Sequence, residues 1–196
     1  MEIEHHPLEP FLPPNARLLM LGSFPPPKHR WAMDFFYPNF SNQMWSIFGL
    51  VFYDDADRLI NKDTHTFRQS DIQALLTERG IAIFDTACAV RRLSGNASDK
   101  DLEIVEKTDI LMLLSQLPHC HDIVCTGQKS FSVLADDYGV PVPAMGTFCE
   151  IESGKLNIDN SVRLWRMPSS SRAYPMKLED KASYYRKMML HIGLLP

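Results

Sequence analysis

The chain has 196 residues, of which 45% are hydrophobic and 22% charged, as in ordinary globular proteins. One domain spanning residues 1–196 is the expectation at this length. The formal net charge of −4 argues against a general nucleic-acid binder, and no apolar run reaches membrane-spanning length. The opening "MEIEHHPLEP" is polar and acidic, which argues against a signal peptide and indicates a cytoplasmic protein.

Apolar runs predict four strands, at residues 16–24, 80–88, 122–127 and 162–170. The first three are almost continuously apolar, which is typical of strands covered on both faces. Helix-like segments lie around them, at 41–52, 70–80, 108–118, 127–139 and 179–193. This alternation predicts an α/β domain with a mainly parallel, four-stranded sheet and helices on both faces.

Two further patterns concern the sheet edge and the cysteines. Alternation in "EIESGKLNI" (150–158) around Ser-Gly predicts a small hairpin or an edge strand. Cys88 and Cys125 lie in apolar runs, which favours buried free thiols. The chain has no C-x-x-C, and "HCHD" (119–122) reads better as a loop entering a strand than as a metal site. We therefore expect no metal and no other cofactor.

Unusual residues follow the end of each predicted strand, where open α/β sheets bind ligands. Gly22 and Ser23, and Thr126 and Gly127, are small enough for a backbone to approach a ligand closely. Basic residues gather in the same loops, while most acids lie elsewhere; the basic set is Lys28, His29, Arg30, Arg91, Arg92, Lys129, Arg166, Arg172 and Lys177. A basic rim that faces a polyanion is one interpretation, and ordinary loop decoration is the other.

Serines, aromatic rings and amides complete the set of candidate binding residues. Ser169, Ser170 and Ser171 are suited to a phosphate, or to ordinary capping and turn formation. A planar base needs a stacking surface, and the candidates are Phe24, Phe36 and Tyr37, for which core packing is the alternative. Asn42 can bond to a base edge or position a water, or it can cap the following helix.

With these loops in view, the sequence resembles the uracil-DNA glycosylase superfamily, and most closely its mismatch-specific and hypoxanthine (deoxyinosine) branch. "LGSFP", "FFYP" and "NQMW" resemble the first motif of that branch, and "GIAIFDTACAVRRLSGNASDKDL" is similar to its Gly-x-Ala-apolar-x-Asp segment. "DIVCTGQKS" and "RMPSSSRA" resemble its third strand and its Leu-Pro-Ser-x-Ser-x-Ala motif. The four pieces occur in order and cover nearly the whole chain.

The resemblance implies a three-layer α/β/α fold and a monofunctional enzyme that flips a damaged base out of DNA and hydrolyses its N-glycosidic bond without a metal. The base would contact Gly22, Phe24, Phe36, Tyr37, Asn39, Thr126 and Gly127. DNA phosphates would contact Lys28, Arg30, Arg91, Lys129, Ser169, Ser170, Ser171 and Arg172. A monomer acting on DNA is the expectation, although the sequence does not determine the oligomeric state.

The predicted catalytic residues are Asn42, Ser23 and Asp85. Many relatives place an Asp or Asn where this chain has Ser23 and Phe24, so the resemblance moves catalytic importance to Asn42. An alignment centred on Pro38 would favour Asn39 instead, whereas one centred on Trp45 favours Asn42. Asp85, near the end of the second strand, is a further candidate, with a turn or capping role as its alternative.

Three other interpretations stay open. A catalytically silent member of the same fold would bind nucleic acid or a nucleotide, which the missing acid at Ser23 motivates. A lyase would need Lys28 or Lys129 as a Schiff-base nucleophile, and nothing marks either lysine as desolvated. A serine hydrolase would use Ser23 or the serines at 169–171, but the chain has no G-x-S-x-G elbow.

Overall fold

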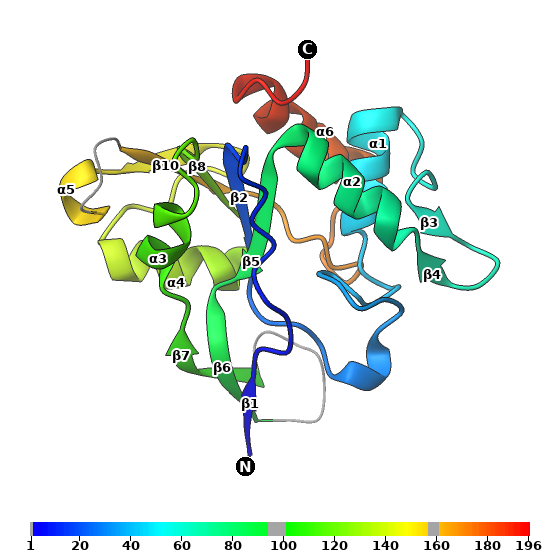
Figure 1. Ribbon diagram of the computed structural model, residues 1–196, viewed down its shortest axis with the longest axis horizontal. Helices are drawn as coiled ribbons and strands as arrows, with labels where there is room; N and C mark the ends of the chain where they lie inside the picture. Colours follow the sequence, from blue (N-terminus) through cyan, green and yellow to red (C-terminus); the bar gives the residue numbers. More distant parts are fainter. Residues whose placement is uncertain (1, 94–100, 157–160) are drawn as a thin grey trace.

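The structure of the chain is a computed structural model, and it describes residues 2–93, 101–156 and 161–196 (Figure 1). Its central sheet has the strand order β5–β2–β8–β10–β9. The first four strands in this order are parallel and match the four predicted ones: β2 Leu18–Gly22, β5 Ile81–Asp85, β8 Asp122–Cys125 and β10 Val162–Arg166. The mainly parallel sheet is confirmed, and the predicted number of strands is corrected from four to five.

The fifth strand, β9 (Phe148–Ile151), pairs with β10 in the antiparallel sense at the edge of the sheet. Of the two structures predicted for residues 150–158, the edge strand is therefore the one found. Ser153 begins the short helix α5 (Ser153–Leu156) instead of forming a hairpin turn. The last two residues of that segment lie outside the described residues.

Helices cover both faces of the sheet, as predicted, and this explains why every residue of β2 and β5 is buried. Figure 1 shows two groups of helices on opposite sides of the sheet. One group is α1 Met44–Tyr53, α2 Gln69–Arg79 and α6 Leu178–His191, and the other is α3 Ile110–Ser115 and α4 Gln128–Tyr138.

Glycine ends helix α2 in the way the sequence predicts, but the predicted start of that helix is wrong. Gly80 has a φ of 66° at the end of α2, a left-handed conformation that glycine adopts without steric cost. Ser70, predicted to cap the helix, lies inside it, because α2 begins at Gln69. The error is one of position by two residues, which is usual at helix ends.

A second, antiparallel sheet was not predicted. It has the order β1–β6–β7, with bounds β1 Ile3–His5, β6 Ala87–Arg92 and β7 Leu102–Lys107. The chain passes from β5 to β6 through Thr86 alone, so the segment read as a loop after β5 is a strand that leaves the central sheet (Figure 1). Residues 94–100, which belong to the stretch that resembles the Gly-x-Ala-apolar-x-Asp segment, lie outside the described residues.

The remaining elements are short. The helix η1 (Lys28–Arg30) follows the three prolines, and β3 (Ile60–Asn61) pairs with β4 (Thr66–Phe67). In the described ranges, no helix combines the length and the apolar character needed to cross a membrane. Nor do the described His, Cys, Asp and Glu side chains form a cluster of three or more suited to a metal ion. His119 and His121 are exposed, whereas Cys120 between them is buried.

Asp122 anchors the start of β8 to the neighbouring strand. Its side chain is 6% exposed, and it accepts hydrogen bonds from the Arg163 guanidinium and the Trp165 indole, both at 2.7 Å. Both partners belong to β10. Removal of the carboxylate would leave two donors without their acceptor, one of them deep in the protein.

We expect Asp122→Ala to lower the free energy of unfolding by about 3 kcal/mol, because the substitution breaks a largely buried ion pair. Urea denaturation followed by circular dichroism measures this. Asp71→Ala is the matched control, because Asp71 forms only an exposed ion pair with Arg58 at 3.8 Å. The control should change stability by less than about 1 kcal/mol. Equal losses in the two variants would contradict the anchoring role of Asp122.

Candidate active site

The parallel strands all end on the same side of the central sheet, so the predicted loops that follow them lie together at its carboxyl-terminal end (Figure 1). Gly22 ends β2 and Asp85 ends β5, and their Cα atoms are register partners. Thr126 and Gly127 follow β8, and residues 169–171 follow β10. The structure therefore brings together residues that lie more than a hundred positions apart in the sequence.

At this end of the sheet, the Asp85 carboxylate lies against the backbone of Gly22. A Cβ atom built on Gly22 would lie 2.3 Å from Asp85 Oδ1, a distance at which real atoms clash. It would also lie 3.3 Å from the Tyr37 hydroxyl. Glycine is thus required at position 22 because a carboxylate oxygen and a phenol both lie against its Cα.

Tyr37 is held above the strand ends in an unusual backbone conformation. Its φ is 50°, in the left-handed region that non-glycine residues rarely adopt. Its hydroxyl forms a hydrogen bond of 2.7 Å with Thr126 Oγ1, and its ring meets Trp45 edge to face. Burial and the nearby Asp85 carboxylate hold the pKa of the Tyr37 hydroxyl well above its usual value. The phenol therefore stays protonated and keeps a proton to donate.

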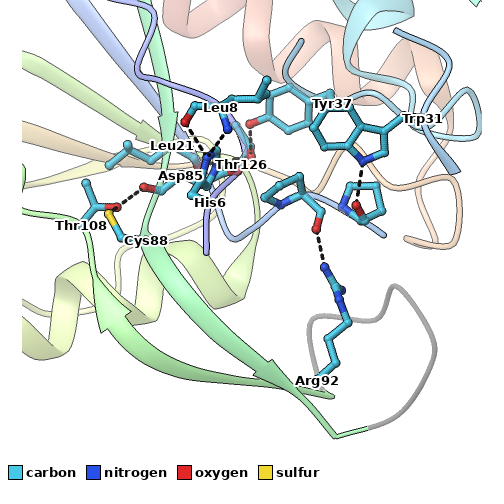
Figure 2. A network of polar contacts seen from close by, with 12 residues as sticks. His6, Leu8, Leu21, Trp31, Tyr37, Asp85, Cys88, Arg92, Thr108 and Thr126 are labelled. Carbon is cyan, nitrogen blue, oxygen red and sulfur yellow. Dashed lines mark hydrogen bonds and ion pairs between the residues drawn. The ribbon is translucent and has the colours of Figure 1, made fainter. Parts of the chain in front are cut away.

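Asp85 has a partner that the sequence analysis missed. His6 Nε2 lies 3.0 Å from Asp85 Oδ2, and the two side chains are 4% and 10% exposed (Figure 2). On the other side of the ring, Nδ1 contacts the backbone of Leu8. His6 was missed because "EHHPLEP" has the composition of a polar terminal segment, and only its pairing with β6 buries one of the two histidines.

Asn42 is not the cap of the helix, which was its alternative interpretation: the N-cap of α1 is Gln43, and it makes no side-chain capping hydrogen bond. Asn42 lies one residue earlier, and its Oδ1 accepts a hydrogen bond of 2.9 Å from the backbone N–H of Met44. Within the part of the chain that the structure describes, Asn42 Nδ2 has no hydrogen-bond partner. The turn into the helix therefore uses one lone pair of Oδ1 and leaves both N–H donors of the amide unused.

The segment around Asn42 is attached to the loop that follows β10. Asn42 pairs with Ser171 in an isolated bridge, and the backbone N–H of Gln43 donates to Ser170 at 2.9 Å. Lys181 from α6, which is completely buried, donates to Gln43 Oε1 at 2.8 Å and to the Ser171 carbonyl at 2.7 Å. Burial lowers the pKa of Lys181. Three segments distant in sequence thus fix the position of the Asn42 amide.

The other predicted amide, Asn39, lies in the turn before Asn42. Its Oδ1 accepts from the backbone N–H of Ser41 at 2.9 Å, and its carbonyl accepts from the N–H of Asn42 at 2.7 Å. Asn39 therefore shapes the turn that presents Asn42. Gly127, the N-cap residue before α4, has a φ of 145° that only glycine adopts readily, and its Cα faces Ser169.

Two of the three rings predicted to stack on a base lie in the interior. Phe36 is 3% exposed and packs against Phe35 and Phe84, and Phe24 is 9% exposed and packs edge-on against His6. Core packing, the alternative for these rings, describes both of them. Tyr37 is half-buried, and it is the ring of the three that carries a hydroxyl, which bonds to Thr126. Ser23, next to Gly22, is also half-buried.

The five basic residues predicted to bind phosphate differ in what neutralises them. Lys28 pairs with Asp34 and Arg91 with Glu103, while Lys129 donates to the carbonyl of Leu102. Arg30 and Arg172 are exposed, and neither takes part in an ion pair among the described residues. Arg30 and Arg172 are therefore the exposed members of this set without an ion pair, whereas Lys129 is half-buried and keeps its charge beside a neutral carbonyl. Ser170 is buried, whereas Ser169 and Ser171 are half-buried.

Two surface hollows lie away from this edge. One, of about 380 Å³, is lined by Asp55, Asp57, Arg58, Ile60, Asn61, Lys62, Asp63 and Arg68. The other, of about 320 Å³, is lined by Met176, Asp180, Ser183, Tyr184 and Lys187. Neither hollow contains a predicted site residue.

Comparison with known proteins finds a likeness among solved structures. No protein-family model and no curated protein matches the chain. Among solved structures, the chain is similar to the solution NMR structure of a protein from Methanosarcina acetivorans described as a "putative Uracil DNA glycosylase". The TM-score is 0.62 at 18% sequence identity, and the match covers 98% of this chain and 99% of the other. The two proteins therefore share an α/β fold over their whole length.

We expect Gly22→Ala to displace the Asp85 carboxylate, because the new methyl group would occupy the position of Oδ1. The overpacking should cost about 1–3 kcal/mol of stability. Gly154→Ala is the control, since a Cβ at Gly154 meets nothing within 4 Å. Thermal denaturation and a crystal structure of each variant measure the two effects. An Asp85 side chain that keeps its position in Gly22→Ala would show that the contact does not require glycine.

Proposed function

We propose that the protein is a DNA glycosylase of the uracil-DNA glycosylase superfamily, in its hypoxanthine branch, that excises a deaminated base. Hypoxanthine is the favoured substrate and uracil a further one. The observation that carries the proposal is the cluster of Asp85, Tyr37 and Thr126 around Gly22, at the strand ends where this class of fold binds ligands. The full-length likeness to a structure described as a putative uracil DNA glycosylase supports it.

In the proposed reaction the base is flipped out of the duplex and its N-glycosidic bond is hydrolysed without a metal. Water adds to C1′ of the sugar as the bond from C1′ to the base nitrogen breaks. The bonding electron pair leaves with the base, and the attacking water gives up a proton to the Asp85 carboxylate. The same carboxylate stabilises the positive charge that develops on the sugar. Ser23, beside Gly22, is predicted to bind the attacking water.

The orientation of Asn42 suggests why a deaminated base would be selected. Its Oδ1 already accepts from the Met44 N–H, so the part of the amide left for a substrate is chiefly the Nδ2 donor. Deamination replaces an amino group, which donates, by a carbonyl oxygen, which accepts. A lone donor therefore favours hypoxanthine over adenine, and uracil over cytosine. The same hydrogen bond would stabilise the negative charge on the departing base.

The decisive experiment measures the release of free base from oligonucleotides that contain deoxyinosine, deoxyuridine or deoxyxanthosine. We expect release of hypoxanthine, and a fall of about 10²–10³ in the single-turnover rate for Asn42→Ser, because one transition-state donor is lost. A serine hydroxyl can accept the same turn hydrogen bond from the Met44 N–H, so this variant should stay close to the native protein in stability. Asn42→Ala loses both the donor and the turn hydrogen bond.

The outcomes separate the proposal from its rival. Undiminished release by Asn42→Ser would remove Asn42 from the mechanism, and the same substitution at Asn39 would then be tested. A wild-type protein that releases none of the three bases but binds DNA with a strong salt dependence would favour a catalytically silent binding module.

DNA binding is expected to depend on the two unpaired arginines. Arg172→Ala should weaken binding of every sequence alike and reduce the slope of log K against log salt by about one, as expected for the loss of one phosphate contact. Lys62→Ala is the control, because Lys62 is not among the predicted phosphate-binding residues and already pairs with Asp57. Fluorescence anisotropy at several salt concentrations measures the slope. An unchanged slope in Arg172→Ala would place the phosphates elsewhere.

A further inference from the structure

The contact between His6 and Asp85 gives the two carboxylate oxygens of Asp85 different surroundings. Oδ2 lies 3.0 Å from His6 Nε2 (Figure 2). Oδ1 lies against the Cα of Gly22. One oxygen is thus held by the imidazole and the other is directed to the strand end. A carboxylate that is only 10% exposed needs such a donor, because a buried charge without hydrogen bonds is strongly destabilised.

The contacts of Nδ1 with the backbone of Leu8 limit the protonation states that the His6 ring can adopt. Nδ1 lies 3.2 Å from the N–H of Leu8, which donates to it, and 2.8 Å from the Leu8 carbonyl. If Nδ1 accepts from Leu8, the neutral ring carries its proton on Nε2; if Nδ1 donates to the carbonyl, Nε2 carries a proton as well when the ring is an imidazolium. In both states Nε2 donates to Asp85. The third state, with a lone pair on Nε2, would set that lone pair against the carboxylate.

Apolar rings hold the imidazole in this orientation. The centroid of His6 lies 4.5 Å from that of Phe84 and 5.3 Å from that of Phe24, with Phe36 at 6.1 Å. These rings leave the imidazole little freedom to turn. Phe24 and Phe36 are buried because they enclose the imidazole ring that bonds to Asp85.

The N-terminal segment is attached on both sides of His6. Before it, β1 pairs with β6, and the backbone N–H of His6 itself donates to Cys88 at 2.7 Å. After it, Phe11 bridges Ile83 of β5 through two backbone hydrogen bonds. The segment therefore runs antiparallel along both strands and places His6 at their junction, where Asp85 is located.

We propose that His6 is the positioning residue of the catalytic carboxylate: its Nε2–H holds Oδ2 of Asp85 so that Oδ1 stays at the strand end to receive the proton of the attacking water. This inference rests on the proposed glycosylase function and adds to it a residue and a role. The N-terminal segment is the part of the chain that brings His6 to Asp85.

Two substitutions separate the hydrogen bond from the packing of the ring. His6→Phe keeps a ring among Phe24, Phe36 and Phe84 but has no donor, whereas His6→Gln keeps an N–H near the position of Nε2 and loses the ring. The matched controls are the same two changes at His5, whose side chain is exposed on β1. Single-turnover base release and DNA affinity are measured for all four variants.

We expect His6→Phe to lower the single-turnover rate by about tenfold to a hundredfold, because a misplaced catalytic group costs on this scale. DNA affinity should not change. His6→Gln should stay within about threefold of the wild-type rate, since its donor still holds Asp85. In an Asp85→Asn background, His6→Phe should cause no further loss, because His6 acts through the carboxylate. The His5 variants should behave as the wild-type protein does.

The results that overturn the inference differ from those that overturn the function. If the wild-type protein releases base, two results would reject the positioning role and leave the proposed glycosylase function intact. One is a His6→Phe variant that works at the full rate. The other is a His6→Phe substitution that lowers the rate by the same factor in the wild-type and in the Asp85→Asn background. A retained rate in His6→Phe with a loss in His6→Gln would reduce His6 to ring packing. A wild-type protein that releases no base would reject both proposals. If His6→Phe does not fold, His6→Gln and its double variant with Asp85→Asn decide the matter.

Discussion

The placement of a carboxylate on the bare backbone of Gly22 is the constraint on which the rest of the site depends. Asp85 ends a buried strand, and the parallel register of β5 and β2 sets its side chain beside Gly22. A charge in such a position is costly unless donors surround it. The N-terminal segment therefore crosses to bring His6, and the Tyr37 hydroxyl lies near the same point. Much of the local architecture follows from holding one negative charge at the end of a sheet.

The strained conformation of Tyr37 is understandable in the same terms. A left-handed φ of 50° costs free energy in a residue with a large side chain, and it persists only where the surroundings enforce it. Here the hydrogen bond to Thr126 and the edge contact with Trp45 fix the ring. The strain is located at the residue that bridges β2 and β8 at their carboxyl ends, where a precise position has a chemical use.

The central sheet could be predicted from sequence because its signal is local. A strand such as β2 or β5, covered on both faces, is an uninterrupted apolar run, and Gly80 ends a helix for reasons of its own backbone. The antiparallel sheet has no such signal. Residues 87–92 mix small, apolar and basic side chains, and they form a strand because β1 and β7 supply partners from elsewhere in the chain. His6 was invisible for the same reason, since its burial depends on a contact 79 positions away.

In Asn42 a structural role and the proposed chemical one do not compete. An amide has two ends, and the turn into α1 uses the oxygen while both N–H donors stay without a partner among the described residues. The turn hydrogen bond also fixes the orientation of the amide, and with it the end that a substrate would meet in the proposed reaction.

The two halves of the site are held from opposite ends of the chain. The first residues supply His6 to Asp85, whereas α6, at the other end, supplies the buried Lys181 that ties Gln43 to Ser171 beside Asn42. Neither half is stable as a local structure, since each rests on a buried polar group whose partners are remote in sequence. The carboxylate and the amide therefore reach their working positions only when the whole domain has folded.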